Sequence, residues 1–278
     1  MPTLPPSPAA DAGVSVPQPL QTHCVQRWVD GQAGAPAQDV LIEETPVALE
    51  FNGITYATML VTPSDLEDFA RGFALTEGVV QSCQEIYGID IKPTSDGIVL
   101  HVEIASARAQ SLRQRKRAMA GRTGCGLCGV ESLDQVLRPL KHVCNPPVIS
   151  QSAVNRALTA MSRQQPLYQA TGASHAAALA SLDGTLIAVR EDVGRHNALD
   201  KLIGATAVQS GRGMVVVSSR ASFEMVQKTL AAGYVLLAAV SAPTAMAQRL
   251  ASEHDLTLIG FAREKKVTVY AGMHRVEA

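Results

Sequence analysis

Two short and almost wholly apolar runs, at residues 214–217 and 234–240, constrain the fold of this chain most strongly. They are too short for buried helices and lie between segments with helical periodicity. Such runs are typical of strands that are buried on both faces and covered by helices. From residue 150 onward we predict helices at 151–162, 195–208, 222–232 and 243–254, and strands at 174–182, 185–191, 214–217, 234–240, 256–262 and 267–271. This pattern predicts a three-layer α/β domain over residues 149–278.

That order of elements resembles the cytidine-deaminase-like fold, whose zinc enzymes carry His-x-Glu at one helix start and Pro-Cys-x-x-Cys at the next. The corresponding stretches here are Asp192-Val193-Gly194-Arg195-His196-Asn197 and Ser218-Ser219-Arg220-Ala221-Ser222. No glutamate lies two residues after His196, and the second stretch has no cysteine. We therefore expect a cytidine-deaminase-like architecture without zinc deaminase chemistry.

The first half of the chain has a different pattern and predicts a smaller α+β subdomain at residues 22–148. Residues 1–21 are rich in proline and alanine, and we expect a disordered tail there. Asn52-Gly53 between two alternating apolar runs predicts a hairpin of strands 47–51 and 54–61. The remaining expectations are a strand at 24–29 followed by a Gly/Ala/Pro loop, a helix from a Ser64–Glu67 capping box to Gly78, strands at 85–92 and 97–104, and helices at 106–119 and 131–137.

A glycine-rich loop, Gly121-Arg122-Thr123-Gly124-Cys125-Gly126-Leu127-Cys128-Gly129, is the main candidate for chemistry. Its four glycines allow a tight turn and let another molecule approach the two sulfur atoms. Nearby cations favour the thiolate, which is the nucleophilic form of cysteine. These cations are Arg113, Arg115, Lys116, Arg117 and Arg122. We interpret Cys125 and Cys128 as a nucleophilic or sulfur-carrying pair.

Three other interpretations of the cysteine pair remain open. The pair is half of a structural zinc site if His142 and Cys144 supply the other ligands. It is a thioredoxin-type redox pair if a strand leads into it, although no clear strand does. It is inert if the glycines only form a turn. We expect no bound metal, because the loop suits an open nucleophile better than a closed site.

The overall composition excludes several classes of protein. A formal net charge of −1 over 278 residues argues against nucleic acid as a partner. Five cysteines in a chain of this length do not form a disulfide framework. We find no signal-peptide pattern and no apolar run long enough to cross a bilayer. The expectation is a cytoplasmic protein that does not bind membranes.

Three polar turns follow predicted strands in the second half, and we predict that they bind a phosphorylated ligand. Free N–H groups and the positive dipole at helix starts favour anions. The candidate residues are Arg195 and His196, then Ser219 and Arg220, then Phe261, Ala262, Arg263, Glu264, Lys265 and Lys266. The alternatives are that Ser219 and Ser222 only cap helices, that Asp192 and His196 only close a turn, and that residues 261–266 form a solvated turn.

Four stretches together resemble one known family, the formate dehydrogenase accessory sulfurtransferases (FdhD/NarQ). They are Arg122-Thr123-Gly124-Cys125-Gly126-Leu127-Cys128-Gly129, Glu191-Asp192-Val193-Gly194-Arg195-His196-Asn197-Ala198-Leu199-Asp200-Lys201, Ser218-Ser219-Arg220 and Gly260-Phe261-Ala262-Arg263. The resemblance covers roughly residues 40–272. It is more specific than a lone Cys-x-x-Cys, because several motifs match together.

This resemblance implies a sulfurtransferase that carries sulfur as a persulfide. It implies that Cys125 accepts sulfur from a cysteine desulfurase and that Cys128 assists. The sulfur would pass to the molybdenum (or tungsten) cofactor bis(molybdopterin guanine dinucleotide), which then enters apo formate dehydrogenase and makes that enzyme active. Residues 261–266 would contact the cofactor, GDP would mimic its nucleotide arm, and the protein would be a homodimer. Two rival functions remain, an insertion chaperone that moves no sulfur and a zinc-stabilised nucleotide-binding protein.

Overall fold

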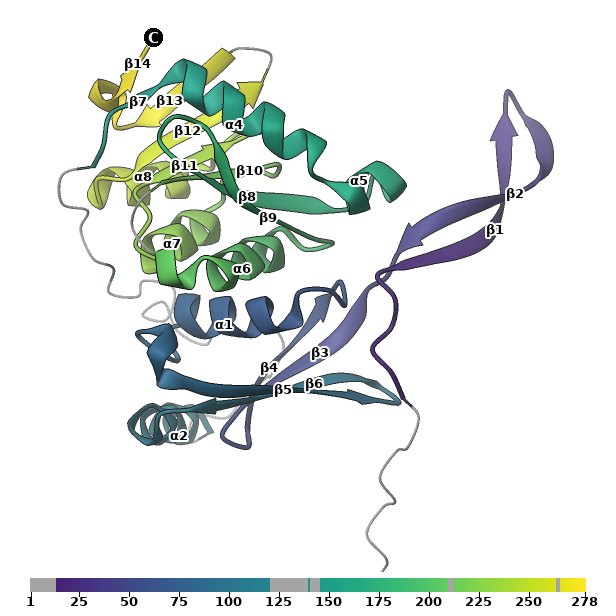
Figure 1. Ribbon diagram of the computed structural model, residues 1–278, viewed down its shortest axis with the longest axis horizontal. Coiled ribbons are helices and arrows are strands. Elements are labelled where there is room, and N and C mark those ends of the chain that lie inside the picture. Colours follow the sequence, from purple (N-terminus) through teal and green to yellow (C-terminus); the bar gives the residue numbers. More distant parts are fainter. Residues whose placement is uncertain (1–13, 121–139, 141–145, 210–212, 264–265) are drawn as a thin grey trace, which may run out of the picture.

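The structure, a computed structural model, describes residues 14–120, 140, 146–209, 213–263 and 266–278 (Figure 1). Two sheets lie in separate layers, with helices from both halves of the chain between them. The expected helix at 131–137 and the cysteine loop lie outside the described residues. No helix in the described ranges is long and apolar enough to cross a membrane.

The C-terminal half confirms the predicted alternation of strands and helices. Its six-stranded sheet has the order β13-β12-β11-β10-β8-β9, in which β10, β11 and β12 are parallel and the other pairs antiparallel. The strands are β8 (His175–Ala180), β9 (Leu186–Asp192), β10 (Met214–Val217), β11 (Leu236–Ala239), β12 (Thr257–Arg263) and β13 (Lys266–Ala271). The helices are α4 (Gln151–Arg163), α5 (Pro166–Thr171), α6 (Arg195–Ala205), α7 (Phe223–Ala231) and α8 (Ala245–Glu253). Helix α5 was not predicted.

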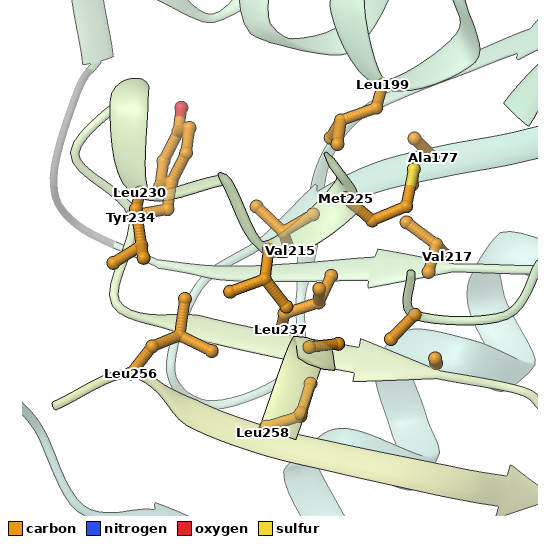
Figure 2. Packing of buried hydrophobic residues seen from close by; sticks show 14 of the residues in the cluster. Ala177, Leu199, Val215, Val217, Met225, Leu230, Tyr234, Leu237, Leu256 and Leu258 are labelled. Carbon is orange, nitrogen blue, oxygen red and sulfur yellow. The ribbon is translucent and has the colours of Figure 1, made fainter. Parts of the chain in front are cut away.

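Helices cover both faces of this sheet, so the expected three-layer arrangement is confirmed. On one face, Val154 and Met161 of α4 pack against Val216 and neighbouring strand residues. On the other face, α6, α7 and α8 cover the sheet, and Figure 2 shows Leu199 and Met225 above the strands. The apolar runs are thus buried from both sides, as their composition predicts.

The N-terminal half has a four-stranded sheet in the order β4-β3-β6-β5, with β3 and β6 parallel. The predicted hairpin, the strand pair and both described helices are confirmed. The elements are β3 (Thr45–Phe51), β4 (Ile54–Val61), α1 (Leu66–Thr76), β5 (Ile86–Thr94), β6 (Gly97–Ile104) and α2 (Ser106–Ala120). The described residues also form short elements: β7 (Ile149–Ser150), which pairs with β14 (Val276–Glu277), and 3-10 turns at Cys83–Glu85, Ala207–Gln209 and Met273–Arg275.

The Gly/Ala/Pro loop predicted after residue 29 is wrong, because that segment is a strand. Strands β1 (Leu20–Val29) and β2 (Gln32–Ile42) form an antiparallel arm that projects from the body (Figure 1). The turn between them is Asp30-Gly31, with both residues at positive φ, as a tight hairpin requires. Most arm residues are exposed, Trp28 at 66%, so no alternating apolar pattern marks the strands. The arm also begins at Leu20, inside the expected tail, whose first 13 residues lie outside the described part.

The predicted capping box at the start of α1 is also wrong. The residue at the N-cap is Asp65, in a left-handed conformation, and its side chain makes no capping hydrogen bond. Glu67 instead forms an ion pair with Arg71, one helical turn later, at 2.8 Å. The Ser64 hydroxyl is buried and has no hydrogen-bond partner among the described residues.

Helices α1 and α6 join the two halves through a close approach that depends on two glycines. A Cβ atom on Gly72 of α1 would overlap the carbonyl oxygen of Asp200 in α6. A Cβ atom on Gly204 of α6 would overlap the carbonyl oxygen of Asp68 in α1. Each helix therefore places a glycine against the backbone of the other.

We predict that Gly204→Ala or Gly72→Ala lowers the free energy of unfolding by about 1–3 kcal/mol or more, because the added methyl forces the helices apart. In an ordinary helix interior the same change would stabilise the protein by about 1 kcal/mol. Urea denaturation measures the difference. As a control, Thr159→Ala on the exposed face of α4 should change stability by no more than about 0.5 kcal/mol. A neutral or stabilising Gly204→Ala would contradict the close packing.

Candidate functional site

All three predicted turns lie at one edge of the six-stranded sheet. Strands β10, β11 and β12 are parallel, so their carboxyl ends meet at the same edge. The antiparallel pair β8 and β9 joins them there, since His175 at the start of β8 is opposite Asp192 at the end of β9. The Ser218 amide donates to the Ala176 carbonyl at 3.0 Å, next to the same position. The fold thus gathers turns that are up to 71 positions apart along the sequence, from Arg195 to Lys266.

Backbone hydrogen bonds continue across this edge beyond the ends of the strands. The Ser241 amide donates to the Ser219 carbonyl at 3.4 Å, and the Phe261 amide donates to the Ser241 carbonyl at 3.2 Å. Only one intervening segment therefore separates Ser219 from Phe261. With a strand spacing of about 4.8 Å, their backbones lie roughly 10 Å apart. Two of the predicted turns thus form a single surface.

Three cations on this surface are exposed and free of ion pairs within the described residues. They are Arg220 after β10, Arg263 at the end of β12 and Lys266 at the start of β13. Arg263 and Lys266 are opposite each other in the β12–β13 ladder. Glu264 and Lys265, between them, lie outside the described residues. The arrangement offers guanidinium and ammonium donors to an anion at the sheet edge.

The serines of the second turn do not act as ordinary helix caps. Ser219 is buried, and its hydroxyl donates to the Arg220 carbonyl at 3.0 Å. Ser222 occupies the N-cap position of α7, but its side chain makes no capping hydrogen bond. Its hydroxyl oxygen is buried and has no partner among the described residues. The N-terminus of α7 therefore keeps donors that an anionic ligand could use.

Arg195 and His196 begin α6, beside α7. The His196 Nε2 atom lies 2.6 Å from a Glu224 carboxylate oxygen, and this interaction lowers the pKa of Glu224. Arg195 has a buried Nε atom without a hydrogen-bond partner in the described part of the chain. His175 is close by, and burial together with the Arg195 charge lowers its pKa. Arg195 is therefore more available than His196 to bind an anion.

A fully buried ion pair underlies this turn. The Lys201 Nζ atom lies 2.7 Å from an oxygen of Asp192, and both side chains are 0% exposed. The other Asp192 oxygen accepts hydrogen bonds from the Gly194 amide at 2.8 Å and from Asn197 Nδ2 at 3.1 Å. Asp192 therefore closes the turn, as one alternative held. His196 instead pairs with Glu224 on the next helix.

The same ion pair reaches the N-terminal half through Thr62, which directly follows β4. The Thr62 amide donates to Asp192 at 3.0 Å, and the Thr62 carbonyl accepts from Lys201 at 2.9 Å. The Thr62 hydroxyl accepts from the Val193 amide at 3.1 Å. The amide, the carbonyl and the hydroxyl of Thr62 thus all help to hold the turn that precedes α6. The sequence contained no signal for Thr62, because its partners are about 130 residues away.

A second buried cluster links α1, α6 and α7. The Lys228 Nζ atom lies 2.8 and 2.9 Å from the two Asp200 oxygens, 3.1 Å from Glu77 and 2.9 Å from the Thr76 hydroxyl. Burial alone would lower the pKa of Lys228, but the two carboxylates outweigh it and raise the pKa. The sequence did contain one signal for buried charge in this region: Asp200 and Lys201 are adjacent charged residues inside an apolar helical stretch.

Cys125 and Cys128 lie outside the described residues. What the structure describes is the helix that leads toward them, α2, which ends at Ala120. It contains the predicted cations at positions 113, 115, 116 and 117, and Arg113 is exposed. The cationic run is therefore helical, as predicted.

We predict that Lys201→Met or Asp192→Asn lowers the free energy of unfolding by about 3–5 kcal/mol, because each leaves a buried charge without its partner. The double variant should lose less than the sum of the single losses. Chemical denaturation of the four proteins gives this coupling energy. Arg27→Met, which breaks the exposed Arg27–Asp39 pair, should cost no more than about 1 kcal/mol. Additive losses would show that the two buried residues act independently.

Comparison with known proteins identifies the family and the fold. The model of the FdhD/NarQ family matches residues 42–277. A protein of Bordetella bronchiseptica named "Sulfur carrier protein FdhD" is 52% identical over 265 residues, covering 94% of this chain and 96% of that protein. A protein of the same name from Cupriavidus necator is 49% identical and covers 96% of this chain and 94% of its own length. A crystal structure described as a putative formate dehydrogenase accessory protein from Desulfotalea psychrophila has the same fold, with a TM-score of 0.74 at 21% identity, over 93% of this chain and all of that one. The chain belongs to the FdhD/NarQ family.

Proposed function

We propose that this protein is a sulfur carrier for the maturation of formate dehydrogenase. The observation that carries the proposal is the Cys125–Cys128 pair, which follows a cationic helix in a chain about half identical to proteins named sulfur carriers. Cationic surroundings favour the thiolate form of cysteine. A sulfur carrier needs a reactive and accessible thiolate, and the four glycines around the pair in the sequence would let a partner approach the sulfur atoms.

The proposed loading step is a transfer of one sulfur atom between two cysteines. The Cys125 thiolate attacks the outer sulfur of a persulfide on a cysteine desulfurase. A new S–S bond forms to Cys125, the S–S bond on the donor breaks, and the donor cysteine leaves as a thiolate. The persulfide proton stays with the transferred sulfur or passes to water, so the step needs no external oxidant. Cys128 would assist release of the sulfur from Cys125.

The proposed acceptor is the molybdenum cofactor bis(molybdopterin guanine dinucleotide), which the protein would hold as cargo. Its phosphates carry negative charge, and the sheet edge offers Arg220, Arg263 and Lys266 as exposed cations. The start of α6 adds Arg195, whose Nε atom has no hydrogen-bond partner among the described residues. Charge-assisted hydrogen bonds from such groups would replace the water around the phosphates. An open groove of about 890 Å³ beside α4 contains none of these residues, so we do not place the cofactor there.

The proposal includes partners and place of action. Sulfur would come from a cysteine desulfurase, the loaded cofactor would go to apo formate dehydrogenase in the cytoplasm, and the protein would act as a homodimer. An insertion chaperone would use the same cationic edge, so the edge does not separate the two functions. Sulfur bound to Cys125 does separate them, because a chaperone that moves no sulfur has no use for a persulfide.

We predict that Cys125 gains one sulfur atom when the protein is incubated with a cysteine desulfurase and cysteine. Intact-mass analysis would show the gain, and a reductant would remove it. Cys125→Ala should abolish the gain, whereas Cys128→Ala should retain part of it. Cys24→Ala is a matched control, because Cys24 is an exposed cysteine on β1, and it should load normally. Undiminished loading in Cys125→Ala would overturn the assignment.

We predict that the intact protein binds GDP at the cationic edge. Each charge-assisted hydrogen bond contributes about 1.5–3 kcal/mol, so Arg220→Ala and Arg263→Ala should each weaken binding about tenfold or more. Arg263→Lys should restore binding only partly if the contact is bidentate. Titration calorimetry measures the affinities.

Arg156→Ala removes an exposed cation of α4 that donates to the Asp183 carbonyl, in the β8–β9 turn at the other end of the sheet, and should leave GDP affinity unchanged. Wild-type affinity in both Arg220→Ala and Arg263→Ala would place the nucleotide elsewhere.

A further inference from the structure

Phe261 has a backbone conformation that bulky residues rarely adopt. Its φ angle is +49°, in the left-handed region where a side chain meets the following carbonyl. The other non-glycine residues with positive φ in the described chain are Asp30, Asn52, Asp65 and Asp255. Aspartate and asparagine are several-fold enriched in this region, whereas a bulky phenylalanine there is an outlier. Such an outlier persists only where the surroundings impose it, and it is a reason to look for function.

The residues on both sides of Phe261 show how the conformation is imposed. A Cβ atom on Gly260 would lie 2.7 Å from Pro243 Cδ and 3.0 Å from a ring carbon of Tyr270, so the strand runs close against its neighbours. The Phe261 amide is bound to the Ser241 carbonyl, and Ala262 is only 1% exposed. The β12–β13 register shifts between Gly260 and Arg263, and such irregularities re-aim side chains next to functional sites. With its neighbours held, the Phe261 ring faces solvent and is 41% exposed.

The surroundings of this exposed ring are cationic. Arg263 is two residues further along β12, opposite Lys266. The Ser219–Arg220 turn is one hydrogen-bonded segment away, through Ser241. An inorganic anion would make no use of the ring, and an apolar partner would make no use of the cations. A ligand with a planar heterocycle and phosphates uses both, because bases stack on aromatic side chains while cations hold the phosphates.

We propose that Phe261 is the platform on which the purine ring of the bound dinucleotide stacks. The inference rests on the proposed function and specifies how the ring, as distinct from the phosphates, is recognised. The strained backbone presents the ring before the ligand arrives, so little ordering is required on binding. Arg220 and Arg263 contact phosphate, and Phe261 contributes affinity only for ligands that carry a ring.

The experiment compares GDP with inorganic pyrophosphate, which lacks a ring, by calorimetry on the full chain. Phe261→Gly should weaken GDP about fivefold or more, the range for loss of one stacking contact, and leave pyrophosphate within about twofold. Glycine adopts positive φ without strain, so the thermal unfolding midpoint should not fall. Phe261→Trp should retain GDP affinity. Tyr87→Ala, which removes another exposed aromatic residue on β5, should change neither affinity.

The outcomes separate this inference from the proposed function. Wild-type GDP affinity in Phe261→Gly would overturn stacking while leaving the cationic edge in place. Equal losses of GDP and pyrophosphate would also overturn it, because Phe261 would then only maintain the shape of the turn. Absence of GDP and pyrophosphate binding in the unaltered protein would refute the cofactor edge itself, and the stacking platform with it.

Discussion

The buried pair of Lys201 and Asp192 is the interaction on which the rest of the structure depends. Two charges without exposure to water are costly unless each is paired and hydrogen-bonded. Here Asp192 receives two backbone amides and one side-chain amide in addition to Lys201. Because two of the partner groups belong to Thr62, the charges are satisfied only when the N-terminal sheet is docked on α6. Each half of the chain therefore needs the other half in order to fold.

This requirement gives the long polar motif before and within α6 a structural meaning. Of its residues, Asp192, Asn197 and Lys201 are buried and bound to Thr62 or to the carbonyl of Leu60. Arg195 and His196 remain partly exposed at the sheet edge. The motif thus contains buried residues that fix the turn, and partly exposed residues that the turn holds at the sheet edge. A ligand at the edge would meet a surface whose shape is set by contacts on its buried side.

The prediction of regular elements succeeded where burial leaves a periodic pattern and failed where it does not. Strands β10 and β11 have interiors that are apolar throughout, and the Asn52-Gly53 hairpin has a defining turn. Strand β2 was missed because both its faces meet solvent and its composition is that of a loop. The Ser64–Glu67 cap failed because Arg71 competes for the glutamate. Thr62 could not be predicted as part of the site, since its role depends on residues more than a hundred positions away.

The projecting arm has a consequence for spectroscopy. Trp28 is the single tryptophan of the chain, and it lies on β1 of the arm with 66% of its surface exposed. Its indole emission therefore reports the environment of a solvent-facing ribbon and carries almost no information about the two packed sheets. Loss of the core would be nearly silent in tryptophan fluorescence, whereas contact of the arm with any other surface would shift the signal to shorter wavelength. Trp28 is therefore an intrinsic fluorescent probe of the arm.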